Sequence, residues 1–208
     1  MSRYHELLAQ CGNAKLIVVS KNHPWSECQP LYEDGARNFA ENRVQIALPK
    51  QSEAPSDIAW HFIGPLQTNK VHKVIGAFQM IHSVDDLPLA ERISEASLAK
   101  GIVTPILLQV NTSGEKAKQG NSPETWEYDL DQAATLRGVS IRGLMTMAPL
   151  TDDKQGVRSC FRRLREWRDD WQKRGNLALS ELSMGMSHDY LIALEEGATM
   201  VRIGSALF

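Results

Sequence analysis

The sequence predicts an α/β protein whose 208 residues form a single (β/α)₈ TIM barrel. Three observations lead to this prediction: eight short apolar runs recur, amphipathic segments lie between them, and polar residues follow each run. Apolar strands that alternate with amphipathic helices are typical of a parallel sheet covered by helices. An open doubly wound sheet is the main alternative, but no G-x-G-x-x-G follows the first expected strand.

The first expected strand illustrates the pattern. It holds four consecutive apolar residues, from Leu16 to Val19, which is typical of a short buried strand. The second and seventh strands are the least apolar, so a helix competes for each of them. In chain order, the expected strands cover residues 15–20, 36–41, 59–64, 79–84, 104–111, 140–147, 179–185 and 199–204.

Three connecting segments have the apolar spacing of amphipathic helices: residues 68–78, 85–99 and 156–171. The expected N-cap of the second is Ser83 or Asp85. The third carries an arginine-rich run, 162–168, which we expect to be a solvated helix face rather than a nucleic-acid patch.

Composition excludes several classes of function. The formal net charge is −2 and the pI is about 6.3, so no global field favours nucleic acid or an anionic membrane. No apolar run is long enough for a signal peptide or a membrane span. Cys11, Cys28 and Cys160 are odd in number and far apart, so neither a disulfide framework nor a zinc site is indicated. We therefore expect a cytoplasmic protein without a bound metal.

Polar residues gather where the expected strands end. Lys21 follows the first strand directly, although burying a lysine is costly unless its charge is paired or lost. The C-terminal ends of barrel strands share one rim, which is where barrel enzymes keep their active sites. Strand ends meet water in any case, so a single polar residue there means little. The whole set of such residues predicts a site at this rim.

Two strand ends predict a phosphate site. Gly185 and Ser187 stand where a helix is expected to begin, with Asp189 in its first turn, and Gly204 and Ser205 stand at the next strand-to-helix junction. Free N–H groups at helix starts, glycine and hydroxyl donors together bind anions. Barrels commonly bind phosphate after their seventh and eighth strands. Ordinary N-capping by the two serines is the simpler alternative.

Seven segments of the chain resemble the pyridoxal phosphate homeostasis proteins, from about residue 15 to the end. The segments are VVSKNHP, FAENRVQ, WHFIGPLQTNK, VNTSGEKAKQG, GLMTMAP, SMGMSHD and ATMVRIGSALF. That family is related to the barrel domain of bacterial alanine racemase and binds pyridoxal 5′-phosphate (PLP) without a second domain. The resemblance therefore implies that residues 1–208 form a single PLP-binding barrel domain of the alanine racemase N-terminal type.

The resemblance also implies the residues that bind PLP. Lys21 corresponds to the lysine that holds the cofactor as a Schiff base. Ser187, Gly204 and Ser205 match the phosphate-binding positions, and Ser205 stands where threonine is common. Ala40 departs from the usual glycine of its motif.

Three further residues match motifs around the cofactor. Arg202 corresponds to the arginine that faces the pyridine nitrogen, and Asn42 and His61 lie in motifs that line the pocket. Arginine is always charged and only donates hydrogen bonds, so it disfavours protonation of that nitrogen. The ring is then a weak electron sink, poorly suited to transamination or decarboxylation.

A carrier or buffer of PLP with little or no turnover is therefore the expected function, and a single-domain amino-acid racemase is the alternative. Racemization needs a base on each face of the substrate, and Lys21 supplies only one. Of the four tyrosines, only Tyr190 is expected to approach the rim. A barrel that binds another phosphorylated metabolite is a further alternative. We expect a monomer, with PLP-dependent apoenzymes as its recipients.

Overall fold

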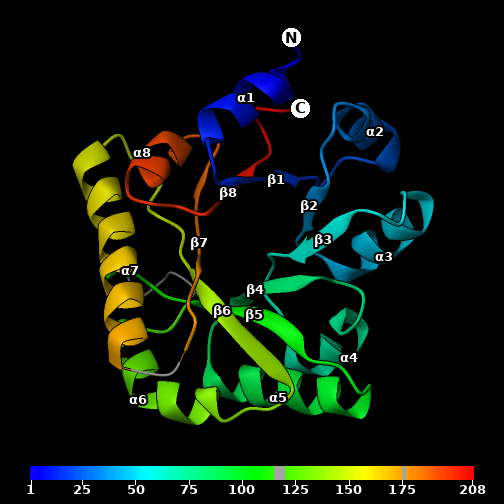
Figure 1. Ribbon diagram of the computed structural model, residues 1–208. Helices are drawn as coiled ribbons and strands as arrows, with labels where there is room; N and C mark the ends of the chain where they lie inside the picture. The colour runs from blue at the N-terminus through cyan, green and yellow to red at the C-terminus, as the bar shows by residue number, and fades with distance from the viewer. Residues whose placement is uncertain (115–119, 175–176) are drawn as a thin grey trace.

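Eight parallel strands pair in chain order, and β8 closes onto β1 to form a barrel in the computed structural model (Figure 1). The structure describes residues 1–114, 120–174 and 177–208. All eight predicted strands are confirmed, and the closure rules out an open doubly wound sheet. The strands are β1 (Lys15–Val19), β2 (Asn38–Glu41), β3 (Ala59–Phe62), β4 (Met80–Val84), β5 (Thr104–Gln109), β6 (Val139–Met145), β7 (Glu181–Met186) and β8 (Met200–Ile203).

Helices surround the barrel and connect successive strands (Figure 1). The helices are α1 (Arg3–Cys11), α2 (Trp25–Glu33), α3 (Val44–Glu53), the 3₁₀ helix η1 (Thr68–Lys70), α4 (Val71–Val74), α5 (Leu87–Ala99), α6 (Pro123–Ala134), α7 (Lys154–Arg174) and α8 (Tyr190–Glu195). No helix within the described ranges is long and apolar enough to cross a membrane.

The first strand is apolar on both faces because each face packs against a different layer. In β1, Ile17 and Val19 belong to the cluster inside the barrel, whereas Leu16 and Val18 belong to the cluster between the barrel and the helices. Side chains alternate between the two faces of a strand, so burial on both sides requires a continuous apolar run. This is why the run 16–19 marked the first strand so clearly.

Two of the predicted helices differ from their expected bounds. Segment 68–78 forms η1 and the four-residue α4 instead of one continuous helix. The N-cap of α5 is Asp86, whose side chain accepts a hydrogen bond from the N–H of Leu89 at 2.8 Å, so neither predicted cap residue is correct. Ser83 instead donates its hydroxyl proton to the carbonyl of Gly64.

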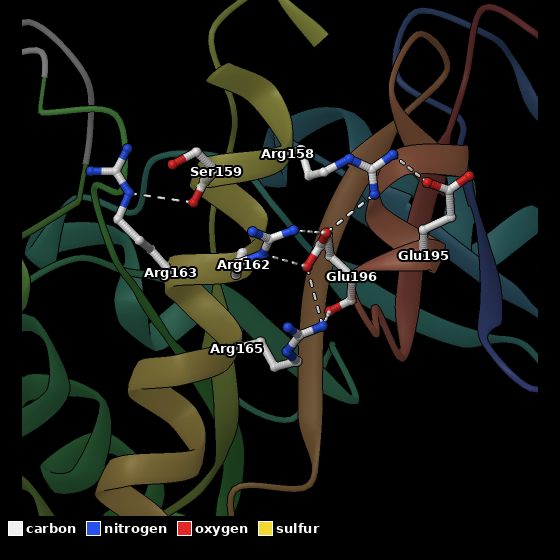
Figure 2. A network of polar contacts seen from close by, with 7 residues as sticks. All are labelled: Arg158, Ser159, Arg162, Arg163, Arg165, Glu195 and Glu196. Carbon is white, nitrogen blue, oxygen red and sulfur yellow. Dashed lines mark hydrogen bonds and ion pairs between the residues drawn. The ribbon is translucent and has the colours of Figure 1, made fainter. Parts of the chain in front are cut away.

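The arginine-rich part of α7 ties that helix to the end of α8. Figure 2 shows Arg158, Arg162 and Arg165 converging on Glu196, which is 4% exposed. The hydrogen bond from Arg162 is the main reason that the pKa of Glu196 lies below its usual value. The run is therefore only partly the solvated face that the sequence predicted. Its ion pairs hold α8, which follows the loop that carries Ser187.

Candidate functional site

Lys21 lies in a tight turn at the C-terminal end of β1. The N–H of His23 donates to the carbonyl of Ser20 at 3.1 Å, which closes the turn around Lys21 and Asn22. Asn22 has a φ of 69°, a left-handed conformation that asparagine tolerates better than most residues. Ser20 is fully buried, whereas Lys21 is exposed. The turn therefore places an exposed Lys21 at the C-terminal end of β1, where the sequence predicts it.

A buried ion pair lies behind this turn. Lys50 of α3 donates to a carboxylate oxygen of Glu41 at the end of β2, and it also donates to the carbonyl of Ser20 at 2.7 Å. Ser20 Oγ donates to the same carboxylate oxygen at 2.8 Å. Sequence reasoning missed Lys50, although a signal was present. Lys50 stands in phase with Val44 and Ala47 on the buried face of α3.

Ser187 and Gly204 meet between the ends of β7 and β8. The N–H of Gly204 donates to Ser187 Oγ at 3.3 Å. Ser187 Oγ accepts this bond, and no residue in the described parts of the chain accepts its hydroxyl proton. That proton can therefore point to a bound anion.

The two strand ends differ from their predicted shape. Gly185 lies within β7, Asp189 is the residue before α8 rather than part of its first turn, and neither Ser187 nor Ser205 caps a helix. After β8, residues 205–207 form a turn and no helix follows. Ser205 is exposed on this turn. The predicted phosphate cradle is thus built from turns, with N–H and hydroxyl donors in place of two helix starts.

Gly204 brings this cradle next to the strand that carries Lys21. A Cβ atom at Gly204 would lie 3.3 Å from the carbonyl oxygen of Val19 and 3.4 Å from its Cβ. These are tighter contacts than most side chains make, so glycine suits the position. Because β7, β8 and β1 are neighbours in the barrel, Ser187, Gly204 and Lys21 lie along one arc of its rim.

Arg202 lies inside the barrel on β8, two residues before Gly204. It is 4% exposed and donates to Ser183 Oγ at 2.6 Å and to the carbonyl of Thr146 at 3.0 Å. Burial lowers its pKa to about 10, so the guanidinium keeps its charge at neutral pH. Neither partner carries a charge. Arg202 is therefore a buried cation whose donors have only neutral acceptors among the described residues.

A chain of hydrogen bonds leads from Arg202 across the barrel. Ser183 Oγ lies 2.8 Å from His82 Nδ1, His82 Nε2 lies 2.9 Å from His61 Nδ1, and His61 Nε2 lies 3.3 Å from Asn38 Oδ1. Asn38 Oδ1 can only accept, so the neutral His61 donates from Nε2 and accepts at Nδ1 from His82 Nε2. The neutral His82 therefore accepts at Nδ1 from the hydroxyl of Ser183, which itself accepts from Arg202.

Burial keeps both imidazoles neutral. It lowers the pKa of His61 to about 4 and lowers that of His82 well below the usual value, with a further contribution from the charge of Arg202 to His82. His61 is 3% exposed in the barrel interior. It is connected by hydrogen bonds to Arg202 through His82 and Ser183.

Asn42 follows β2, which neighbours β1, so it lies on the rim next to the turn that carries Lys21. It is half-buried and lines a cleft of about 380 Å³ together with residues of the β3–η1 loop. A Cβ atom at Gly64 would lie 2.0 Å from the carbonyl oxygen of Asn42, so only glycine allows the two loops to pack this closely. The WHFIGPLQTNK segment thus holds Asn42 in place.

Tyr190 points away from the rim. Its hydroxyl donates to Gln10 of α1, and the side chain is 9% exposed. The other three tyrosines lie on α1, α2 and α6. Tyr190 was the predicted candidate for a second proton-transfer group, and its contact with α1 assigns it to helix packing instead.

The residues of this arc fit PLP. The neutral hydroxyl of Ser187 and the Gly204 turn suit a phosphate, and a donor-only cation suits an unprotonated pyridine nitrogen. Lys21 supplies an amine at the same rim. Part of the VNTSGEKAKQG segment, 115–119, lies outside the described residues. Within them, no cluster of three His, Cys, Asp or Glu residues is placed to hold a metal.

Comparison with known proteins shows the family to which the chain belongs. The family described as alanine racemase, N-terminal domain, matches residues 2–208. A pyridoxal phosphate homeostasis protein of Aquifex aeolicus is 44% identical over 196 residues, which cover 94% of this chain and 86% of the relative. The protein of the same name from Pseudomonas aeruginosa is 43% identical over 194 residues, covering 93% and 83%.

Solved structures show the same fold. PipY of Synechococcus elongatus PCC7942 with PLP bound superposes with a TM-score of 0.92 at 38% identity, and the match covers 100% of both chains. An alanine racemase of Streptomyces coelicolor A3(2) superposes with a TM-score of 0.83 at 19% identity, covering 99% of this chain and 56% of that one. The second match supports the barrel fold alone.

Proposed function

Because the chain belongs to the pyridoxal phosphate homeostasis proteins, within the alanine racemase N-terminal domain family, we propose that it binds PLP and takes part in PLP homeostasis rather than acting as an enzyme. The observation that carries this proposal is the arc of Ser187, Arg202, Gly204 and Lys21 on three neighbouring strands. PipY, which shares the fold over its whole length, was solved with PLP bound.

Lys21 is proposed as the residue that binds PLP covalently. Its neutral amine adds to the aldehyde carbon of PLP, a C=N bond forms and one water molecule leaves. Ser187, Gly204 and Ser205 bind the phosphate, and Asn42 borders the cofactor from the end of β2, on the other side of β1 from β8. The whole set lies within one proposed domain, 1–208.

Arg202 is proposed to donate to the pyridine nitrogen and to keep it unprotonated. Bound PLP supplies an electron sink for carbanion chemistry, and an unprotonated nitrogen makes that sink weak. With Tyr190 turned toward α1, this arrangement favours retention and release of the cofactor over turnover.

The proposal includes a cellular setting. Cys11, Cys28 and Cys160 are buried free thiols, which suits a reducing cytoplasm. PLP-dependent apoenzymes are the proposed recipients, and a monomer is the proposed working form.

Borohydride reduction followed by peptide mapping tests the covalent role of Lys21. After incubation with PLP, the reduced pyridoxyl group should appear on the peptide that contains Lys21. Lys21→Ala should abolish labelling while the protein stays folded, because an exposed turn residue contributes little to the core. Lys15→Ala, at the other end of β1, is the matched control and should label normally. A label on a different lysine would contradict the proposal.

A further inference from the structure

A fully buried ion pair lies beneath the turn that carries Lys21. The Glu41 side chain is 0% exposed and that of Lys50 is 4% exposed. Three elements meet there: Glu41 ends β2, Lys50 lies in α3, and Ser20 follows β1. Lys50 bridges all three, since it donates both to Glu41 and to the carbonyl of Ser20.

Burying this ion pair contributes little net free energy to the stability of the fold. Desolvation of two charges commonly cancels their attraction, so apolar side chains of similar volume often serve stability equally well. Among the described residues, Glu41 Oε2 has no hydrogen-bond partner, which adds to the cost. Stability alone therefore does not explain why a lysine and a glutamate occupy this position.

The contact with Ser20 suggests a second role. The Ser20 carbonyl accepts from the N–H of His23, which closes the turn, and from Lys50 Nζ, which connects the turn to α3. The hydroxyl of Ser20 is held by the same carboxylate that binds Lys50. The residue directly before Lys21 is thus fixed at both its backbone and its side chain, although Lys21 itself is exposed.

We propose that Glu41 and Lys50 are positioning residues for Lys21. They hold the Ser20 carbonyl so that the turn presents the Lys21 amine to the aldehyde of PLP bound at the phosphate cradle. This inference rests on the proposed function. It concerns formation of the C=N bond and leaves the phosphate contacts of Ser187 and Gly204 unaffected.

The double variant Glu41→Gln/Lys50→Met tests the proposal, because it removes the bond to Ser20 without leaving an unpaired buried charge. A second variant, Glu41→Gln/Lys50→Gln, keeps two polar groups that can pair if the first variant fails to fold. The control is Lys15→Met/Glu181→Gln, which removes an ion pair of 3.0 Å at the opposite end of β1.

Two ligands separate positioning from general damage. PLP forms the C=N bond, whereas pyridoxamine 5′-phosphate has an amine in place of the aldehyde and binds only by its phosphate and ring. Loss of a hydrogen bond from a charged donor corresponds to about a tenfold effect or more. The double variants should therefore retain PLP about tenfold less well and bind pyridoxamine 5′-phosphate within about twofold of the unmodified protein.

The proposal is overturned if a folded double variant retains PLP normally, or if its affinities for both ligands fall equally. In either case the control variant should match the unmodified protein. Failure of the proposed function has a separate signature. The unmodified protein would then carry no borohydride label on Lys21, whatever the double variants do.

Discussion

Arg202 can only donate hydrogen bonds, and it stands at one end of a chain of hydrogen bonds across the barrel whose other end, Asn38 Oδ1, only accepts. Between these two ends, Ser183 donates to His82 Nδ1 and His82 Nε2 donates to His61 Nδ1. Neither imidazole can accept a second proton without losing the acceptor that its neighbour uses. The positive charge therefore stays on Arg202, where the proposed pyridine contact requires it.

Ser187 supplies the residue-scale prediction for cofactor retention. Its hydroxyl accepts from Gly204 and can donate one neutral hydrogen bond to phosphate, which is a contribution of about 0.5–1.5 kcal/mol. Ser187→Ala should therefore weaken PLP binding about three- to tenfold without abolishing it, and Ser205→Ala should have a similar effect. Equilibrium dialysis measures the affinity. Ser159→Ala, on the exposed face of α7, is the control, and an unchanged affinity in both rim variants would refute these roles.

The two imidazoles make the stability of the fold depend on pH. The pKa of His61 is about 4 in the folded protein and near 6.5 when unfolded, and burial lowers the pKa of His82 as well. Since the unfolded chain binds more protons, the stability is fully present above pH 6.5 and is lost as the pH falls toward 4. For His61 the loss amounts to about 3 kcal/mol.

Urea denaturation at several pH values measures this loss. His61→Gln should flatten the fall in the free energy of unfolding between pH 6.5 and 4. His72→Gln changes an exposed histidine on α4 and should leave the fall unchanged. If His61→Gln follows the same curve as the unmodified protein, the buried imidazole is not its cause.

At the scale of elements, strands were predictable and short helices were not. A strand buried on both faces favours a continuous apolar run, which marked β1 clearly, whereas β2 and β7 are less apolar and a helix competed for each of them. Residues 205–207, where a helix was expected to begin, form a turn. The helix expected over 68–78 is reduced to η1 and the four-residue α4, and a helix this short gains few internal hydrogen bonds. The hydrogen bonds that join Arg202, Ser183 and His82 could not be predicted from the sequence, because only closure of the barrel brings these three strands together.

The α7–α8 contact supplies a prediction at this scale. Glu196 receives Arg158, Arg162 and Arg165, so its removal leaves three arginines close together without their shared partner (Figure 2). Glu196→Gln should lower the free energy of unfolding by about 1–2 kcal/mol. It should also make stability rise with added salt, because salt screens repulsion. Glu127→Gln breaks an exposed pair with Arg174 and should change stability little.

At the scale of the whole molecule, the barrel supports a carrier rather than a racemase. All four tyrosines lie on the surrounding helices, and Tyr190 is bonded to α1. Incubation of the PLP-loaded protein with L-alanine should therefore produce no steady multiple turnover to D-alanine in a chiral assay. Steady racemization that is lost in Lys21→Ala or Tyr190→Phe would overturn the carrier proposal.

The pairing of β8 with β1 also sets the order in which a newly made chain can become functional. Lys21 is synthesised early, but β1 gains its second neighbour only when Met200–Ile203 have left the ribosome. The cradle of Ser187 and Gly204 is complete at the same late moment. Cofactor binding at this arc should therefore follow closure of the barrel. Because this pairing joins residues far apart in the sequence, its loop-closure entropy must be overcome first.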